Sequence, residues 1–449
     1  MSDMREKYES LALNNLKELA KARGIKVTGL KKADLVEAML SEDKKDEEKG
    51  KAVEVKPILN TNTGTAEESY PSELDSGIKA NGILEVMPDG YGFIRCENYL
   101  PGDNDVYVAP SQIRRFNLKT GDIIEGNTRV KTQSEKFSAL LFVKRINGFP
   151  VEVAQRRKNY EDMTPIFPDK RLRLETPGAS NAMRIMDLMS PVGKGQRGMI
   201  VSPPKAGKTT LLKEVAKSLK KNSPEVHLII LLIDERPEEV TDIKEAIEGP
   251  NVEVIYSTFD ELPEHHKRVS EMVIERAKRL VEHRQDVCIL LDSITRLTRA
   301  YNLTVPPSGR TLSGGLDPAA LHMPKRFFGA ARNMRGGGSL TILATALVET
   351  GSKMDDVVYE EFKGTGNMEM VLDRKLSERR VFPAIDIPKS GTRREDLLLT
   401  PDEAEAMNII RKALNGLKPE EAVDKVLDLI AKTKNNAEFV AMVKKIKFL

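Results

Sequence analysis

The segment PPKAGKTT at residues 203–210 is the strongest candidate in the chain for a ligand-binding or catalytic loop. It lies between an apolar run that ends at Ser202 and the helix-forming run LLKEVAKSL, which is the strand, loop and helix context of a phosphate-binding loop. Backbone N–H groups of such a loop surround phosphate oxygens, and the helix start adds partial positive charge. Ser202 replaces the usual first glycine, so an ordinary helix start with a lysine–threonine pair is the simpler alternative.

The residue types within this loop indicate hydrolysis of a nucleoside triphosphate. Lys208 would reach the terminal phosphates, and the hydroxyl of Thr209 would bind Mg²⁺. The other predicted nucleotide contacts in the loop are Pro203, Pro204, Lys205, Ala206, Gly207 and Thr210.

Two later strand ends supply the carboxylates that this chemistry needs. Glu235 ends the apolar run LLIDE and would act as the general base toward the attacking water. Asp292 ends the run VCILLD and would hold Mg²⁺. An aspartate at a strand end is often only a helix cap. Three elements in the right order are much harder to obtain by accident, so together they predict an ATP site with Mg²⁺.

An α/β domain over 186–449 would position these residues. Apolar strands such as GMIVS, VHLIILLID and VCILLD alternate with helical segments such as 265–284. This alternation predicts a parallel sheet with helices on both faces, followed by C-terminal helices over 401–447. Two glycine-rich or polar segments, 305–339 and 347–367, are predicted as functional loops that carry Arg310 and Lys353.

A smaller β domain precedes it over 77–150, where five short strands separated by turns predict a closed barrel. The run YGFIR places Tyr91, Phe93 and Arg95 on one strand face, because strand side chains alternate. Two aromatic rings and an arginine suit base stacking with a phosphate contact, although packing inside the barrel is the plainer interpretation.

The remaining segments are less informative. Residues 1–40 suggest a small helical unit, 41–76 a flexible charged and polar linker, and 151–185 a basic connector. The first part of the linker would also allow a helix stabilised by ion pairs between its positive and negative side chains.

The composition of the 449 residues sets limits on function. Hydrophobic residues make up 40% and charged residues 31%, and the longest apolar runs are too short for a membrane span. Two cysteines exclude a disulfide scaffold and fit a cytoplasmic protein. The net charge of +3 is small, so any polyanion must bind a local patch.

Taken together, several motifs closely resemble the family of bacterial transcription termination factor Rho, in order from about residue 77 to the C-terminus. They include DGYGFIR, GQRGMIVSPPKAGKTTLL, LLIDERPEEVTD, LLDSITRLTRAYN, ATALVETGSKMDDVVYEEFKGTGNMEM and RVFPAIDIPKSGTRRE. The resemblance implies an oligonucleotide-binding (OB-fold) barrel as the primary RNA site and a RecA-like motor domain. It also implies a homohexameric, RNA-dependent ATPase that moves 5′ to 3′, unwinds RNA–DNA hybrids and releases the transcript.

The resemblance also implies a role for each matching residue. Arg393 falls on an arginine finger toward a neighbouring subunit, Arg380 on a second interface arginine, Arg236 beside the catalytic glutamate, and Phe382 on the residue stacked against adenine. The matching barrel positions for pyrimidine-rich RNA are Tyr91, Phe93, Arg95, Asp105, Tyr107, Glu135 and Phe137. Arg310 and Lys353 match the central-channel loops. Tyr91 and Phe137 differ from the expected pattern by one hydroxyl, which would affect the preference for cytosine.

The implied partners are C-rich single-stranded RNA and the RNA polymerase elongation complex, with an elongation factor as a further candidate. Two other interpretations remain open. The first is another RecA-like ring ATPase, such as a rotary or secretion ATPase subunit. ATP turnover that does not depend on RNA would favour this interpretation. The second is a non-enzymatic RNA-binding protein that holds ATP only as a structural ligand, against which Glu235 and Asp292 argue.

Overall fold

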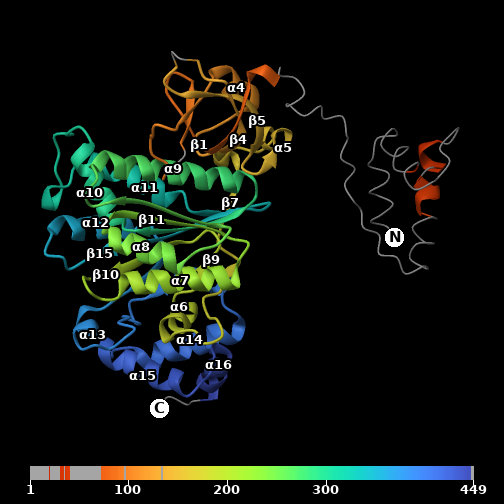
Figure 1. The fold of residues 1–449 in the computed structure, drawn as a ribbon. Helices are drawn as coiled ribbons and strands as arrows, with labels where there is room; N and C mark the ends of the chain where they lie inside the picture. Colours follow the sequence, from red (N-terminus) through yellow and green to blue (C-terminus); the bar gives the residue numbers. More distant parts are fainter. Residues whose placement is uncertain are drawn as a thin grey trace. The chain divides into compact units, whose positions relative to one another are not determined.

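The structure is a computed structural model that describes residue 20 and residues 31–34, 36–40, 72–95, 98–132 and 135–445. The chain forms two compact units, 1–65 and 66–449. Most of the predicted helical unit and linker, as well as Cys96, lie outside the described residues. All labelled elements below belong to the second unit (Figure 1).

A closed barrel forms the first part of this unit. Its strands are β1 (Asp75–Val86), β2 (Gly92–Arg95), β3 (Val106–Val108), β4 (Ile123–Arg129), β5 (Ser138–Ile146) and the short β6 (Phe149–Pro150). They are ordered β3-β2-β1-β4-β5-β6, and the pairing of β3 with β5 closes five of them into the predicted barrel. Helix α4 (Pro110–Phe116) follows β3.

Inward-facing apolar residues and close strand contacts stabilise the barrel. Leu84, Ile94 and Ile124 are fully buried at its centre. A Cβ atom at Gly126 would lie 2.1 Å from the carbonyl oxygen of Phe142 on β5, so only glycine allows this strand pair to approach so closely.

The segment between the two domains is more ordered than a plain connector. It contains α5 (Val151–Gln155), η3 (Tyr160–Asp162), β7 (Pro165–Ile166), β8 (Arg171–Leu172), α6 (Asn181–Met189) and β9 (Val192–Gly193). Part of its basic charge is structural. The Arg157 side chain is only 1% exposed and pairs with Asp122 of the barrel at 2.7 Å and Glu282 of the motor domain at 2.8 Å.

The second domain contains the predicted parallel sheet. Its main strands are β10 (Arg197–Ser202), β11 (His227–Glu235), β12 (Val252–Thr258), β13 (Asp286–Asp292), β15 (Ser339–Leu347), β16 (Met368–Val371) and β17 (Gly391–Thr392). Their order is β12-β11-β13-β15-β10-β16-β17, with β17 antiparallel to β16. The short β14 (Arg332–Met334) pairs with β15 and β7.

Helices cover both faces of this sheet (Figure 1). Ile229 and Leu231 of β11 pack in one core with α9 (Pro263–Glu282) and α10 (Ile294–Thr304). Their neighbours Leu228 and Ile230 pack in the other core with α7 (Lys208–Asn222) and α8 (Pro237–Ala246). Burial on both faces explains why the strand sequences are almost continuously apolar.

The same domain also contains α11 (His322–Gly329), α12 (Lys353–Lys363), α13 (Arg374–Glu378), η6 (Glu395–Leu397), α14 (Pro401–Leu414), α15 (Pro419–Ala431) and α16 (Asn436–Lys445).

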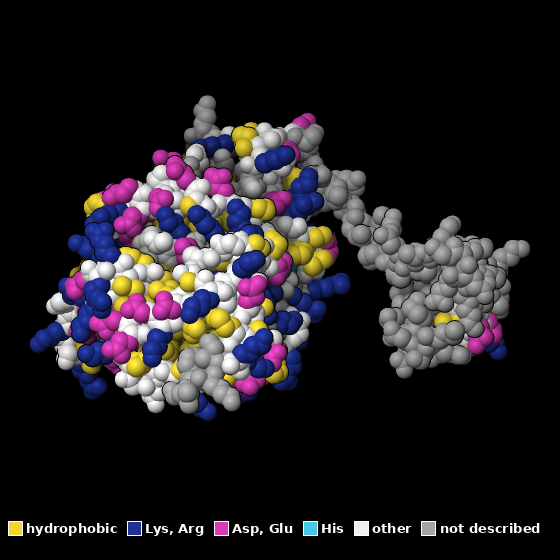
Figure 2. All heavy atoms as spheres, turned by 90° about the horizontal axis from the view of Figure 1, so that it is seen from below, with side chains coloured by type: hydrophobic (Ala, Val, Ile, Leu, Met, Phe, Trp, Pro, Cys, Tyr) yellow, Lys and Arg dark blue, Asp and Glu magenta, His cyan; other side chains and the backbone are white. Residues whose placement is uncertain are grey.

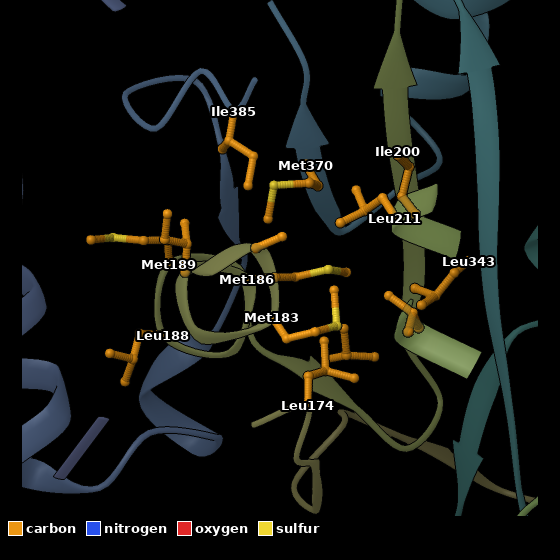
Figure 3. Packing of buried hydrophobic residues seen from close by; sticks show 14 of the residues in the cluster. Leu174, Met183, Met186, Leu188, Met189, Ile200, Leu211, Leu343, Met370 and Ile385 are labelled. Atoms are coloured by element: carbon orange, nitrogen blue, oxygen red, sulfur yellow. The ribbon is translucent and has the colours of Figure 1, made fainter. Parts of the chain in front are cut away.

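The core beneath the phosphate-binding loop is rich in methionine (Figure 3). Met183 and Met186 of α6 pack in one buried cluster with Ile200 of β10, Leu211 of α7 and Met370 of β16. The strand before the loop and the helix after it therefore share one packed core. Flexible methionine side chains fill the irregular space between these elements.

The two predicted functional loops are shorter than expected. The segment 305–339 contains η4 (Ser313–Gly315), η5 (Pro318–Leu321), α11 and β14. Most of 347–367 is α12, so its interpretation as a polar loop is wrong. Val358 and Phe362 are four residues apart on α12 and fully buried, which stabilises a helix despite the polar composition around them.

Within the described part of the chain, every helix is too short or too polar to span a bilayer. On the face seen in Figure 2, Lys and Arg side chains are interspersed with Asp and Glu. This mixture agrees with the small net charge and leaves polyanion binding to local sites.

Candidate nucleotide and RNA sites

The phosphate-binding loop joins the carboxyl end of β10 to α7. Gly207 has φ +93° and precedes Lys208, the first residue of α7, so a left-handed residue turns the chain into the helix. Ser202, at the position of the missing glycine, is fully buried, and its hydroxyl donates to the carbonyl of Pro203 at 2.9 Å. The loop therefore closes with a serine in place of the first glycine.

Lys208 lies between two carboxylates at the carboxyl ends of neighbouring strands. Its Nζ is 3.0 Å from Glu235 Oε1 and 2.5 Å from Asp292 Oδ1. Asp292 also accepts a hydrogen bond of 2.7 Å from Thr345 Oγ1 on β15. Burial lowers the pKa of Lys208, but attraction to Asp292 and Glu235 outweighs it and the pKa is raised. The lysine is thus held in its charged form at the place where phosphate would bind.

Glu235 occupies a buried position suited to a general base. Burial, followed by repulsion from Asp292, raises its pKa above the ordinary value of a glutamate. Arg296 Nη1 lies 2.9 Å from Glu235 Oε1 and orients the carboxylate. Sequence reasoning missed Arg296, although its place four residues after Asp292 on α10, in the run DSITR, was the available signal.

A pocket of about 550 Å³ opens beside this loop and is large enough for a nucleoside. Lys205, Ala206, Gly207 and Thr210 line it together with Phe382, whose side chain is 53% exposed. Pro203 is buried, whereas Pro204 is exposed. Arg236 is exposed at the start of α8, directly after Glu235.

The side chains near Lys208 fit a magnesium ion bound together with phosphate. Thr209 Oγ1 lies 3.5 Å from Glu239 Oε2, and Asp292 is a second oxygen donor close to the loop. No group of three or more acidic, histidine or cysteine side chains forms a metal cluster within the described residues. A site with few protein ligands suits Mg²⁺, which keeps waters and binds substrate phosphates.

The two predicted interface arginines lie at different ends of the sheet. Arg380 is exposed and two residues before Phe382, near the nucleotide pocket. The backbone N–H of Arg393 donates to Asn367, whose own N–H donates to Arg197, the first residue of β10. The phosphate-binding loop follows the last residue of β10, about 17–20 Å away at 3.3 Å per residue. Arg393 therefore does not meet the nucleotide of its own chain.

Arg393 lines a basic cavity of about 670 Å³ with Arg197, Arg332 and Arg394. Among the described residues that line it there is no carboxylate. Burial lowers the pKa of Arg197, and the charges of Arg332 and Arg393 lower it further. Such a cavity would be stabilised by an anion from outside the chain.

The segments that carry Arg310 and Lys353 lie side by side. Gly314 has φ +78°, and a Cβ atom there would lie 2.4 Å from the backbone nitrogen of Met354. The start of α12 is held by Asp355, which pairs with Arg299 of α10 at 2.5 Å. Arg310 and Lys353 are both exposed, so the fold brings two cations to one surface region.

On the barrel, four aromatic rings form one cluster that we call the aromatic face. The ring centroids of Tyr91 and Tyr107 are 5.8 Å apart, and those of Phe93 and Phe137 are 5.1 Å apart. Phe93 also meets Tyr91 at 5.8 Å and Tyr107 at 6.0 Å. All four are only partly buried, in contrast to the fully enclosed barrel core. Their exposure favours the stacking interpretation of Tyr91 and Phe93.

Arg95 is placed differently from the expected phosphate contact. It is 5% exposed, pairs with Glu85 at 2.7 Å and with Asp105, and lies 4.8 Å over the ring of Phe93. Its charge is neutralised, so it positions Asp105 and Phe93. Asp105 Oδ1 is buried and has no hydrogen-bond partner within the described residues. Asp105 directly precedes β3, and Arg95 joins it to the ring of Phe93, so this acceptor lies next to the aromatic face.

Glu135 lies at the border of the aromatic face. It pairs with Arg129, and the backbone N–H of Thr132 donates to its Oε2 at 3.0 Å. The hydrogen bonding from Thr132 is the main cause that lowers the pKa of Glu135. The group therefore stays an ionised acceptor two residues before Phe137.

These two sites define a class of protein: a RecA-type P-loop ATPase preceded by an oligonucleotide-binding barrel. Comparison with known families agrees with both halves. Residues 80–152 match the profile described as "Rho termination factor, RNA-binding domain". Residues 182–392 match "ATP synthase alpha/beta family, nucleotide-binding domain".

Curated relatives extend this match along nearly the whole chain. Transcription termination factor Rho of Aquifex aeolicus is 50% identical over 441 residues, covering 97% of this chain and 94% of the relative. The Rho proteins of Bacillus subtilis and Thermotoga maritima are 58% and 48% identical, covering 80% and 98% of this chain and 83% and 96% of their own lengths. The chain therefore belongs to the family of transcription termination factor Rho.

A solved structure shares the fold of this chain. An ATPase from the type III secretion system of pathogenic bacteria superposes with a TM-score of 0.53 at 19% identity, covering 71% of this chain and 93% of its own. This likeness concerns the fold alone. Family membership sets aside both the secretion ATPase and the non-enzymatic alternatives, and the chain is an RNA-binding ATPase of transcription termination.

Proposed function

We propose that this chain captures C-rich nascent RNA on the aromatic face and pulls it by ATP hydrolysis. It moves 5′ to 3′, unwinds the RNA–DNA hybrid and releases the transcript from RNA polymerase. It does so as a homohexamer in the cytoplasm, where polymerase and an elongation factor are its protein partners. The observation that carries the proposal is the aromatic face with a free buried acceptor, in one compact unit with a nearly complete ATPase site.

The preference for cytosine follows from the chemistry of Asp105. A carboxylate oxygen accepts a hydrogen bond from the exocyclic amino group of cytosine, whereas uracil presents a carbonyl at that position. Stacking on Phe93 and Tyr91 is tolerant of sequence because every base has an aromatic face. The rings thus hold the base, Asp105 and Glu135 read its edge, and Arg95 fixes Asp105.

ATP hydrolysis rests on residues at the carboxyl ends of β11 and β13. Lys208 moves from its carboxylate partners to the phosphates of ATP, and Glu235 is then free to take a proton from the attacking water. Thr209 and Asp292 would hold Mg²⁺, which neutralises phosphate charge when bound. Phe382 stacks on the adenine at the mouth of the pocket. Arg236 binds the nucleotide beside Glu235, and Arg380 acts as a second arginine of the subunit interface.

The position of Arg393 supports assembly into a ring. It lies at the amino end of β10, far from the nucleotide of its own subunit, in a basic cavity that offers positive charge outward. A neighbouring subunit's ATP would supply the missing anion, and an arginine delivered in this way stabilises the transition state. Arg310 and Lys353 then face RNA in the centre of the ring, where cations bind its phosphates.

The first test is ATP hydrolysis by the purified protein with and without poly(C), alongside Lys208→Ala. Strong stimulation by poly(C) that Lys208→Ala abolishes is expected, while poly(C) binding by the variant persists. Equal turnover with and without RNA would contradict an RNA-driven motor.

A further inference from the structure

One oxygen of Glu85 joins the aromatic face to the motor domain. Glu85 Oε2 accepts from Arg95 Nε at 2.7 Å within the barrel and from Arg268 Nη2 at 2.7 Å across the domain boundary. Arg95 continues to Asp105 and to the ring of Phe93. Two guanidinium groups, one beside the proposed RNA site and one on α9, therefore share a single acceptor.

The motor end of this chain of contacts leads toward the ATPase site. Arg268 lies on α9, two residues after His266, whose Nδ1 is 2.7 Å from Ser257 Oγ near the carboxyl end of β12. Burial lowers the pKa of His266, and the negative charge of Asp234 opposes this shift. Arg296 donates to the carbonyl of Asp234 and pairs with Glu235 at 2.9 Å. The first turns of α9 thus lie between Glu85 and the strand end that carries the proposed base.

Arg268 borders a cavity and has a hydrogen-bond donor that no described residue uses, so it can change its partners. It is 34% exposed and lines, with Glu85 and Arg326, a cavity of about 500 Å³ between the barrel and α9 to α11. Within the described residues its Nε is buried without a hydrogen-bond partner. By contrast, Arg157 and Glu282 at the same boundary are fully buried and paired on several sides.

We propose that the Arg95–Glu85–Arg268 contacts couple RNA on the aromatic face to ATP turnover, with Arg268 as a positioning residue. A base bound at Asp105 changes the partners of Arg95, and Glu85 then interacts more fully with Arg268, which shifts the first turns of α9. A ligand acts at a distance only through such a difference in contacts between two states. This inference rests on the proposed function, because it needs RNA to stimulate the ATPase.

The test compares Arg268→Gln with Lys119→Gln. Lys119 is a matched control because it forms another ion pair across the same boundary, with Glu282 at 3.2 Å, and does not contact Glu85. We measure ATP turnover without RNA, its stimulation by poly(C), and poly(C) affinity. In Arg268→Gln, stimulation is expected to fall about tenfold, in the range typical of coupling between sites. Basal turnover and poly(C) affinity stay within about twofold, Lys119→Gln behaves like the wild type, and Arg268→Lys restores part of the stimulation.

Each result separates the two proposals. If poly(C) does not stimulate ATP turnover by the wild type, the proposed function itself is contradicted. If the wild type is stimulated and Arg268→Gln is stimulated equally, the coupling is overturned while the proposed function stands. Equal losses in Arg268→Gln and Lys119→Gln, or a parallel loss of basal turnover, show a merely structural contact and also overturn it.

Discussion

The RNA site on the barrel and the nucleotide site on the motor domain share one arrangement and use it in opposite ways. In each, a cation lies between two carboxylates: Arg95 between Glu85 and Asp105, and Lys208 between Glu235 and Asp292. ATP brings several negative charges, so it must compete with the carboxylates for Lys208. A nucleic acid base is uncharged, so it does not compete for the charge of Arg95 as ATP does for Lys208, and the spare oxygen of Asp105 is the acceptor that it would use.

The charge of each ligand accounts for this contrast between the two sites. At the nucleotide site, we propose that ATP binding draws Lys208 away from Glu235 and Asp292, and that Arg393 of another subunit supplies the balancing charge. At the RNA site, we propose that the aromatic rings contribute most of the affinity, while the ion pairs of Arg95 position Asp105 and respond to the bound base. Substitutions should therefore have large effects on rate at the first site and moderate effects on affinity at the second.

The largest expected effect comes from Arg393→Ala, which removes the charge that reaches ATP from outside its own subunit. Loss of an arginine finger lowers turnover by about 10³- to 10⁵-fold. Steady-state ATP hydrolysis with saturating poly(C) measures it, and Arg394→Ala, in the same cavity, is the control. A loss below tenfold would contradict the role of Arg393 and weaken the case for a shared site.

Glu235→Gln should lower turnover by about 10²- to 10⁴-fold, since it removes the general base but keeps the shape of the side chain. Burial and Asp292 raise the pKa of Glu235, and the base must be ionised to work. Wild-type turnover should therefore fall as the pH drops through this raised pKa, at a higher pH than an ordinary glutamate would give. The pH–rate profile of Glu235→Gln should lack this fall in turnover at low pH. If the profile is unchanged, Glu235 is not the general base.

A smaller effect is expected at the aromatic face. Phe93→Ala should weaken poly(C) binding by about 1–3 kcal/mol, the range for one lost stacking contact. Fluorescence anisotropy with labelled oligo(C) measures the affinity, and Phe116→Ala tests a half-buried ring away from the cluster. Unchanged affinity in Phe93→Ala would place Phe93 among the residues that only stabilise the barrel.

The smallest effect is expected from Asp105→Asn, which keeps the size of the side chain and removes its charge. The preference for oligo(C) over oligo(U) should shrink by about 1 kcal/mol, at the lower end for one base contact. Binding of both oligomers should persist because the rings remain. If discrimination is unchanged, the free oxygen of Asp105 does not read the base.

Much of the fold could be predicted because its signals are local. The predicted strands GMIVS, VHLIILLID and VCILLD of the sheet match β10, β11 and β13, and the predicted barrel strands also match observed elements, since each run is bounded by turns or by a change of period. The segment around α12 could not be read in this way. Its helix depends on burying Val358 and Phe362, a tertiary contact that polar composition conceals.

The site was predicted unevenly for the same reason. Lys208, Glu235 and Asp292 each follow an apolar strand, and the carboxyl ends of parallel strands meet at one edge of a sheet. Arg296 and Glu85 are harder to assign, because the contacts that give them a role, with Glu235 and with Arg268, join residues far apart along the chain.

The order of residues specifies the kinds of chemistry present: a phosphate-binding loop with two strand-end carboxylates, and an aromatic strand in a small barrel. Which charges remain available depends on how the chain packs. Packing buries Arg95 and Arg157 in ion pairs, leaves Asp105 with a free oxygen, and places Arg393 at the opposite end of β10 from the nucleotide. The physical reason is that electrostatic interaction depends on distance and burial, and neither is recorded in the order of residues.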